Sequence, residues 1–262
     1  MFRVMTLNLR FGLAHDGPNA WPHRKKAFPP LFSSYPADLY CFQEANDFQL
    51  KELTAWLPGH RPIGIRHPAP RFWQHNPIYA PISWHVLHWE RLYLSPTPEI
   101  PSRQRTSKWP RQCTIGHFSH DGGDVICINT HFDFAPETQQ ENARIIARRL
   151  ERYPAATPCL LVGDFNAGPG GACHRLLTGG QWMPGRRLRS AFGSKPPGSF
   201  HGFSGTTSGK HIDWILVDRG LRVVSARAVT QAVDGIYPSD HFPVLAAVEH
   251  RGSRSAAAEA AD

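Results

Sequence analysis

The residues with the clearest capacity for chemistry stand at the end of an apolar run within residues 158–167. Four apolar residues between Pro158 and Gly163 predict a short buried strand, and Asp164 and Asn166 follow it two positions apart. In an extended chain, residues two apart point to the same side. A carboxylate beside a carboxamide can orient a water molecule and hold a metal ion or a phosphate oxygen. The same pair could equally form an Asx turn that ends the strand.

Five further places in the chain combine an apolar run with side chains that bind metals or transfer protons. One such combination is ordinary, because short polar residues commonly end strands. Six in one chain are more than turn chemistry explains. The residues at these five places are Asn8, Glu44, Asn129 with His131, Asp213, and Asp240 with His241.

The chain has the length and composition of a globular domain. Its 262 residues, 41% hydrophobic and 19% charged, fit one large domain or two small ones. No segment has the composition of a linker, so we expect one domain over residues 1–250 and a disordered tail over residues 251–262. No apolar run approaches the roughly 20 residues of a membrane-spanning helix, so no membrane span is predicted. We expect the domain to act as a monomer.

The cysteines and the first residues favour a cytoplasmic location. The five cysteines are odd in number, form no CxxC pair, and mostly lie inside apolar runs. Reduced, buried thiols explain them better than disulfides or a zinc site. The chain runs from Met1 directly into an apolar strand, without the basic and apolar regions of a secretory signal.

The charge balance favours partners that carry phosphate. The formal net charge is +8 and the pI is about 9.5. Arginine far outnumbers lysine, and eight tryptophans offer surface on which bases could stack. A basic surface without a specific partner agrees with the composition about as well. Residues 95–110 form a long basic segment with Arg103, Arg105 and Lys108, which is either a functional loop or a solvated connector.

Hydrophobic periodicity predicts strands that alternate with helices, which favours an α/β fold of two packed sheets with helices outside. On one predicted helix, the stripe Arg144, Arg148 and Arg152 should face solvent. The expected strands cover residues 2–8, 38–44, 63–66, 78–82, 84–93, 114–118, 125–129, 158–163, 211–217, 223–229 and 243–248. The expected helices cover residues 19–35 with a break at Pro29-Pro30, 47–57, 136–153 and 173–177, while residues 182–210 are mostly loop.

Six short motifs occur in the order typical of one known family. On these motifs the chain resembles the endonuclease/exonuclease/phosphatase superfamily, whose members include deoxyribonucleases, abasic-site endonucleases, deadenylases, sphingomyelinases and inositol polyphosphate phosphatases. The resemblance spans nearly the whole chain and implies a four-layered α/β sandwich of two packed mixed sheets, with the site at one edge of both. The motifs are Thr6-Leu7-Asn8, Phe42-Gln43-Glu44, Asn129-Thr130-His131, Gly163-Asp164-Phe165-Asn166, Ile212-Asp213-Trp214 and Ser239-Asp240-His241.

The resemblance also implies a metal site. Glu44 resembles the family's principal metal-binding glutamate, with Asn8 beside it, and Asp240 is implied to lie by the metal and the phosphate. Carboxylate and carboxamide oxygens, completed by waters and substrate phosphate, are the ligands that Mg²⁺ prefers. We therefore expect Mg²⁺ or Mn²⁺ as the cofactor.

The remaining motif residues resemble the family's catalytic groups. Asp164 resembles the aspartate that orients the attacking water, and Asn166 resembles its partner. His241 resembles the histidine that contacts the scissile phosphate, with Asp213 fixing its tautomer. His131 resembles the second histidine of the deoxyribonuclease-like branch.

We expect Arg10, Asn129 and Arg111 to contact the substrate. Three features depart from the family pattern, one of which is Pro29-Pro30, which should disturb the first helix. Arg10 stands where the abasic-site branch has a second metal-binding acid. Gln74, two residues before Asn76-Pro77-Ile78, stands where many bacterial relatives carry a glutamate. If that glutamate normally pairs with the second histidine, His131 should be harder to hold as an imidazolium.

Three functions remain open at this point. The first is a divalent-metal-dependent phosphodiesterase that acts on nucleic acid. The second is a phosphatase or phosphodiesterase for a small, lipid or sugar phosphate, for which Phe200, Phe203 and Trp84 could line an apolar pocket. The third is a non-catalytic binding module, which should have lost Glu44 or one of the other core residues.

Overall fold

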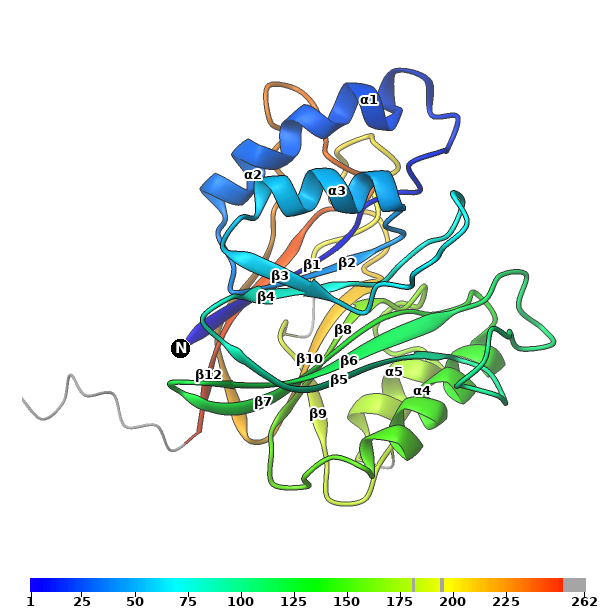
Figure 1. The fold of residues 1–262 in the computed structure, drawn as a ribbon, viewed down its shortest axis with the longest axis vertical. Coiled ribbons are helices and arrows are strands. Elements are labelled where there is room, and N and C mark those ends of the chain that lie inside the picture. Colours follow the sequence, from blue (N-terminus) through cyan, green and yellow to red (C-terminus); the bar gives the residue numbers. More distant parts are fainter. Residues whose placement is uncertain (181, 194–195, 252–262) are drawn as a thin grey trace, which may run out of the picture.

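The computed structural model describes residues 1–180, 182–193 and 196–251. It contains two six-stranded mixed sheets packed face to face (Figure 1). The predicted tail begins at Arg251, and from residue 252 onward it lies outside the described residues. Sheet 1 has the order β11 (Leu221–Ala228), β12 (Val244–His250), β1 (Phe2–Asn8), β2 (Leu39–Gln43), β4 (Ile78–Pro81) and β3 (His60–Ile63). Sheet 2 has the order β5 (His85–Tyr93), β6 (Gln112–His120), β7 (Gly123–His131), β8 (Cys159–Asp164), β10 (Asp213–Asp218) and β9 (Leu188–Ser190).

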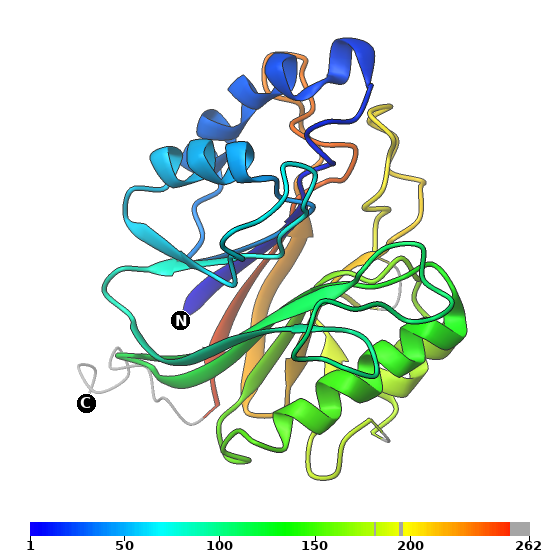
Figure 2. The ribbon, with the colours of Figure 1, turned by 45° about the vertical axis from the view of Figure 1, so that its right-hand side comes forward.

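The helices lie on the two outer sides of the paired sheets, as Figures 1 and 2 show. Sheet 1 is covered by α1 (Trp21–Arg24), α2 (Phe28–Ser34) and α3 (Asp47–Trp56), and sheet 2 by α4 (Pro136–Leu150) and α5 (Ala172–Thr178). The layer order is therefore helix, sheet, sheet, helix. This arrangement confirms the predicted four-layered α/β sandwich.

Three separate apolar layers explain why the four structural layers hold together. Leu160 and Val244 belong to the layer between the two sheets. Phe28 belongs to the layer under the helices of sheet 1, and Ile146 to the layer under those of sheet 2. Leu161 of β8 belongs to a different layer from its neighbour Leu160, because successive strand residues point to opposite faces. Strands buried on both faces give the continuous apolar runs of the sequence.

The break predicted at Pro29-Pro30 is confirmed. The helical segment divides into α1, a 3₁₀ turn over Lys25–Ala27, and α2, with both prolines in the first turn of α2. Proline fits there because the first turn does not need its missing N–H. The segment is therefore divided instead of forming one long helix.

Other element boundaries differ modestly from the prediction. The strand expected at residues 63–66 was placed wrongly: β3 covers His60–Ile63 and shares only Ile63 with it, because Gly64 adopts a φ of 84°. The helix expected to reach residue 153 ends at Leu150. β9 is a three-residue strand within a segment predicted to be loop. The stripe Arg144, Arg148 and Arg152 is exposed, as predicted.

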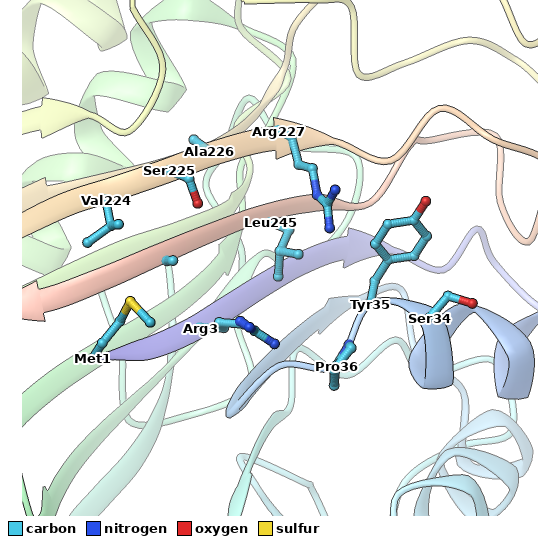
Figure 3. Close-up of a pocket in the computed structure, with 11 residues that line it drawn as sticks. Met1, Arg3, Ser34, Tyr35, Pro36, Val224, Ser225, Ala226, Arg227 and Leu245 are labelled. Carbon is cyan, nitrogen blue, oxygen red and sulfur yellow. The ribbon is translucent and has the colours of Figure 1, made fainter.

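The helices leave part of the outer face of sheet 1 open. A cleft of about 510 Å³ lies there, over β1, β11 and β12 (Figure 3). Arg3, Tyr35 and Arg227 stand around it, and Leu245 lies at its base. None of its lining residues belongs to the predicted site. Within the described residues, no helix is long and apolar enough to cross a membrane.

Candidate active site

The strand pairing brings three predicted residues of sheet 2 into one row. β7 and β8 are parallel, with His131 opposite Asp164. β10 runs antiparallel to β8, and its first residue, Asp213, also lies opposite Asp164. One edge of sheet 2 therefore presents an imidazole and two carboxylates side by side.

Sheet 1 contributes the facing residues in the same way. β1 and β2 are parallel, and Asn8 lies opposite Gln43, so that Glu44 follows at the same edge. The loop before β12 supplies Asp240 and His241, and an isolated bridge pairs His241 with Phe200. The carboxyl ends of parallel strands meet at one edge of a sheet. Because the two sheets pack face to face, the site residues of sheet 1 lie against those of sheet 2.

Asn8 connects the two sheets at the centre of the site. Its Nδ2 donates to Asp164 Oδ2 at 3.0 Å and to Glu44 Oε1 at 3.2 Å. Its Oδ1 accepts a hydrogen bond from the Arg10 backbone N–H at 2.8 Å. Glu44 Oε2 accepts another from the Phe11 N–H at 2.6 Å. The carboxamide thus separates two carboxylates that would otherwise repel each other.

Three site residues have a backbone conformation that non-glycine residues rarely adopt. The φ angles are 61° at Arg10, 61° at Glu44 and 50° at Asn166. Conformations of this kind are costly and persist where the surroundings enforce them, which is most often at functional sites. Each stands one or two residues after a strand end, so the strain helps to turn the chain into the site.

His241 is held as a cation. Its Nδ1 lies 2.8 Å from Asp213 Oδ2, and its Nε2 lies 4.0 Å from both Asp164 Oδ2 and Asp240 Oδ1. Burial alone would lower the pKa of His241, but Asp213, Asp164 and Asp240 together raise it to about 10. The bond to Asp213 therefore directs an Nε2–H donor toward the centre of the site.

Asp164 is a buried carboxylate at the centre of the site. It is 1% exposed, and its Oδ1 accepts a hydrogen bond from the Asn166 N–H at 2.8 Å. Burial, with Asp213 nearby, raises the pKa of Asp164 to about 7, while His241 acts in the opposite direction. A carboxylate with a raised pKa is a better acceptor for a proton from water.

His131 is a neutral hydrogen-bond acceptor. Its Nε2 lies 3.1 Å from Arg111 Nη1 and 3.1 Å from Asn166 Nδ2, both of which are donors. Burial, then Arg111 and His241, lower the pKa of His131 well below its ordinary value. Among the described residues, no hydrogen bond joins Gln74 to His131. The structure thus agrees with the prediction that His131 is not held as an imidazolium.

The donors present suit a hard divalent cation. Glu44, Asn8 and Asp240 offer oxygen atoms, and sulfur ligands are absent from this set. A buried group formed by Asp164, Asp213 and His241 also has the spacing of metal ligands, within 4.8 Å.

A model of the Endonuclease/Exonuclease/phosphatase family matches residues 5–241. The chain belongs to this family. A functionally unknown conserved protein from Enterococcus faecalis V583 is 26% identical with a TM-score of 0.84, covering 95% of this chain and 100% of that chain. The mannosyl-6-phosphatase Bt3783 of Bacteroides thetaiotaomicron has 23% identity, coverage of 95% and 99%, and a TM-score of 0.82. D. rerio TDP2 complexed with single-strand DNA product has 14% identity, coverage of 95% and 98%, and a TM-score of 0.74. A search of curated protein sequences found no match.

Within this member of the family, the two arginines predicted to contact substrate lie on opposite sides of the centre. Arg10 forms two hydrogen bonds with Asp16, at 2.9 and 2.7 Å, and its Nε lies 3.7 Å from Asp240 Oδ2. Arg111 is 7% exposed, and its Nε lies 3.7 Å from Asp133 Oδ2. Acidic side chains therefore neighbour both cations, and Arg111 is buried beside His131.

Asn129 is not brought to the site surface. It is fully buried, and its Nδ2 donates to the carbonyl oxygens of Phe42 and Pro77 at 2.7 and 2.8 Å. Its Oδ1 accepts a bond from Gln43 Nε2 at 2.7 Å. The side chain therefore links the two sheets instead of reaching a substrate. Trp84 also lies elsewhere, stacked on His120 at a centroid distance of 4.2 Å.

Several residues that support the site carry no local sequence signal. Arg24 is buried and donates to the carbonyl oxygens of Leu9, Arg10 and Pro238. Ser239 Oγ donates to the Asn8 carbonyl oxygen at 2.6 Å. Their partners are distant in sequence, so only the motif Ser239-Asp240-His241 could have drawn attention to one of them.

Proposed function

We propose that the chain is a divalent-metal-dependent phosphoester hydrolase that cleaves phosphodiester bonds in nucleic acid. The observation that supports it best is the convergence on Asp164 of Asn8, Asn166 and the cationic Nε2–H of His241. This set pairs a buried carboxylate that can accept a proton with donors that can stabilise a phosphate oxygen. Hydrolysis of a phosphate ester needs both.

The roles follow from the geometry. Asp164 orients the attacking water and accepts its proton as the new P–O bond forms. The ester P–O bond breaks at the same centre, and the departing oxygen takes a proton from solvent. The imidazolium of His241 donates to a non-bridging phosphate oxygen, where negative charge grows, and Asp213 maintains that orientation. Glu44, Asn8 and Asp240 would hold Mg²⁺ or Mn²⁺, which neutralises phosphate charge when bound.

Nucleic acid is favoured by cations and exposed rings around the site. Phe134 is 69% exposed, and the Arg111 guanidinium lies over its ring at 5.5 Å from the centroid. Trp109 is 57% exposed, with Lys108 Nζ at 5.1 Å from its ring centroid. Exposed aromatic rings beside cations suit stacked bases joined by phosphates. The solved structure of D. rerio TDP2 with single-strand DNA has the same fold.

A second candidate substrate is a small sugar phosphate. The side chains at the centre are nearly enclosed, with Asp164 1%, His131 5% and His241 5% exposed. Such a narrow centre could take a terminal phosphate group on a compact molecule. The chain shares its fold with a mannosyl-6-phosphatase, so a sugar phosphate is included among the substrates of the experiment below.

The deciding experiment compares substrates and metals. Purified protein is incubated with supercoiled plasmid, bis(p-nitrophenyl) phosphate or mannose 6-phosphate, each with Mg²⁺, Mn²⁺ or chelator. Metal-dependent plasmid nicking that the Asp164→Asn variant lowers about 10²–10⁴-fold supports the proposal. Release of phosphate from the sugar without nicking would favour the second candidate. Equal activity in chelator and metal would refute the metal-dependent mechanism.

The five cysteines bear on location. All five are free and buried, which suits a reducing compartment, and we propose a cytoplasmic one. Detection of the native protein in a cytoplasmic fraction, with a periplasmic marker as control, tests this location.

A further inference from the structure

A second cleft lies beside the active site. It has a volume of about 760 Å³ and is lined by the start of the first helical segment and by two loops. His23 and Lys26 stand on the helical side, while Phe203 and Tyr237 belong to the two loops. The loop near residue 235, drawn in orange, rises beside α1 in both Figure 1 and Figure 2.

Both loops of the cleft are attached to the active site through Asp240. The Gly202 N–H, next to Phe203, donates to the Asp240 carbonyl oxygen at 3.0 Å. Tyr237 stands three residues before Asp240, so their Cα atoms are at most about 10 Å apart. A substrate whose phosphate lies by Asp240 could therefore place its next group in the cleft.

The cleft has the backbone strain of a functional site. Within the described residues, non-glycine residues with positive φ occur only at the active-site residues Arg10, Glu44 and Asn166, and at Phe203 and Asp234. The φ angle is 64° at Phe203, which lines the cleft, and 49° at Asp234, which precedes the lining residue Gly235. Strain of this kind is held where function requires a particular side-chain placement.

The two loops are fitted to each other. A side chain at Gly205 would place its Cβ 2.2 Å from Tyr237 Oη, so the first loop packs closely on that ring. Tyr237 also packs edge-on against His201, at a centroid distance of 4.8 Å. Beneath the first loop, buried Arg24 lies 5.9 Å from the Phe203 ring centroid. The aromatic walls are thus fixed in place.

The charges of the cleft favour an anion. Lys25 pairs with Glu52 at 2.5 Å, whereas Lys26 has no ion pair within the described residues. His23 is exposed, and no acidic residue lines the cleft in the described part of the chain. Two aromatic walls and one unpaired cation match a base and its phosphate.

We propose that this cleft binds the nucleotide next to the scissile phosphate of a nucleic-acid substrate. The proposal rests on the proposed function. The base of that nucleotide packs against Phe203 and Tyr237, and its phosphate lies by Lys26 and His23. The cleft then determines how well the enzyme distinguishes a polynucleotide from a phosphodiester without flanking groups.

The test compares two substrates across matched variants. Initial rates with Mg²⁺ or Mn²⁺ give KM and kcat for a single-stranded oligonucleotide and for bis(p-nitrophenyl) phosphate. Phe203→Asn removes the ring but keeps the left-handed backbone, which asparagine adopts readily. Lys26→Glu reverses the charge. The controls are Trp89→Ala on β5 and Lys51→Glu on α3, which are exposed residues outside the cleft.

Selective loss is the expected result. Phe203→Asn and Lys26→Glu should each raise KM for the oligonucleotide about fivefold or more, with kcat/KM for the small diester within about twofold of wild type. Unchanged KM, or equal losses on both substrates, would overturn the cleft assignment while leaving the hydrolase intact. If the wild type cleaves the small diester but no oligonucleotide, the nucleic-acid function fails, and the cleft assignment fails with it.

Discussion

Single residues of the site depend on partners that neutralise or separate charge. Asn8 lies between two carboxylates, and Asp213 holds the imidazolium of His241. Neither Asn8 nor Asp213 attacks the substrate itself. Each holds in place a group that would act on the substrate. A mutation of Asp213 should therefore affect mainly catalytic rate, and a mutation of Asn8 mainly the stability of the fold.

Asp213→Asn should lower kcat about 10²–10⁴-fold with little change in fold. The asparagine lacks the negative charge that helps to raise the pKa of His241, so the imidazole would be neutral. If the asparagine donates to Nδ1, the Nε2–H remains a donor but carries no positive charge toward the phosphate. Steady-state kinetics on bis(p-nitrophenyl) phosphate and circular dichroism provide the measurement. Asp124→Asn, at an exposed position, is the control. A variant with full kcat would show that this pair is not part of catalysis.

Asn8→Asp should destabilise the metal-free protein. A third carboxylate would face Glu44 and Asp164 across contacts of 3.2 and 3.0 Å. A destabilisation of about 2 kcal/mol corresponds to a Tm lower by about 4–8 °C. Differential scanning fluorimetry in chelator measures it, with the exposed substitution Gln231→Glu as control. Because Mg²⁺ should offset the added charge, a Tm deficit that is the same with and without Mg²⁺ would contradict this account.

At the scale of elements, the strands place the site and a glycine permits their close approach. Gly163 is the last but one residue of β8, with a φ of 137°, opposite Thr130 of β7. A Cβ there would lie 1.9 Å from the Thr130 carbonyl oxygen. The pairing that sets His131 beside Asp164 therefore requires glycine at this position.

Gly163→Ala should reduce the free energy of unfolding by about 3 kcal/mol or more and remove activity, because β7 and β8 must separate. Urea denaturation followed by tryptophan fluorescence measures the stability. Gly168→Ala is the matched control, since nothing lies within 4 Å of its added Cβ and it should change stability by less than about 0.5 kcal/mol. Similar results for the two variants would be inconsistent with the close approach.

At the scale of the whole molecule, the packed layers bury every cysteine: Cys41 and Cys127 lie between the two sheets, and the other three lie under the helices of sheet 2. All five are free and buried, and the Sγ atoms of Cys41 and Cys127 approach to 3.6 Å across the interface between the sheets. Burial raises the pKa of the Cys159 and Cys173 thiols to about 12, and raises that of Cys113 further. Buried thiols that stay protonated react slowly.

Native protein should therefore react with Ellman's reagent far more slowly than unfolded protein. All five thiols should react at once in concentrated urea. The absorbance of released thionitrobenzoate at neutral pH gives both the count and the rate. Rapid reaction of any thiol in the native state would show that the layer that buries it opens more readily than its packing indicates.

The sequence predicted the fold class and the family, because each motif stands near a strand end and its side chains follow from local geometry. It also predicted that the helical segment would be divided near Pro29-Pro30, because the effect of proline on a helix is local. It did not predict β9, the linking role of Asn129 or the buried Arg24. These depend on partners that only packing supplies.

The amino-acid sequence by itself determined which residues could do chemistry and in which order the strands would present them. Only the tertiary structure decided which of those residues meet. Asn8 and Asp164 are 156 positions apart, and their contact exists because two sheets with separate apolar faces pack at one shared edge. Periodicity is a property of neighbours in the chain, whereas the raised pKa of His241 and the neutral state of His131 arise from charges that packing brings together.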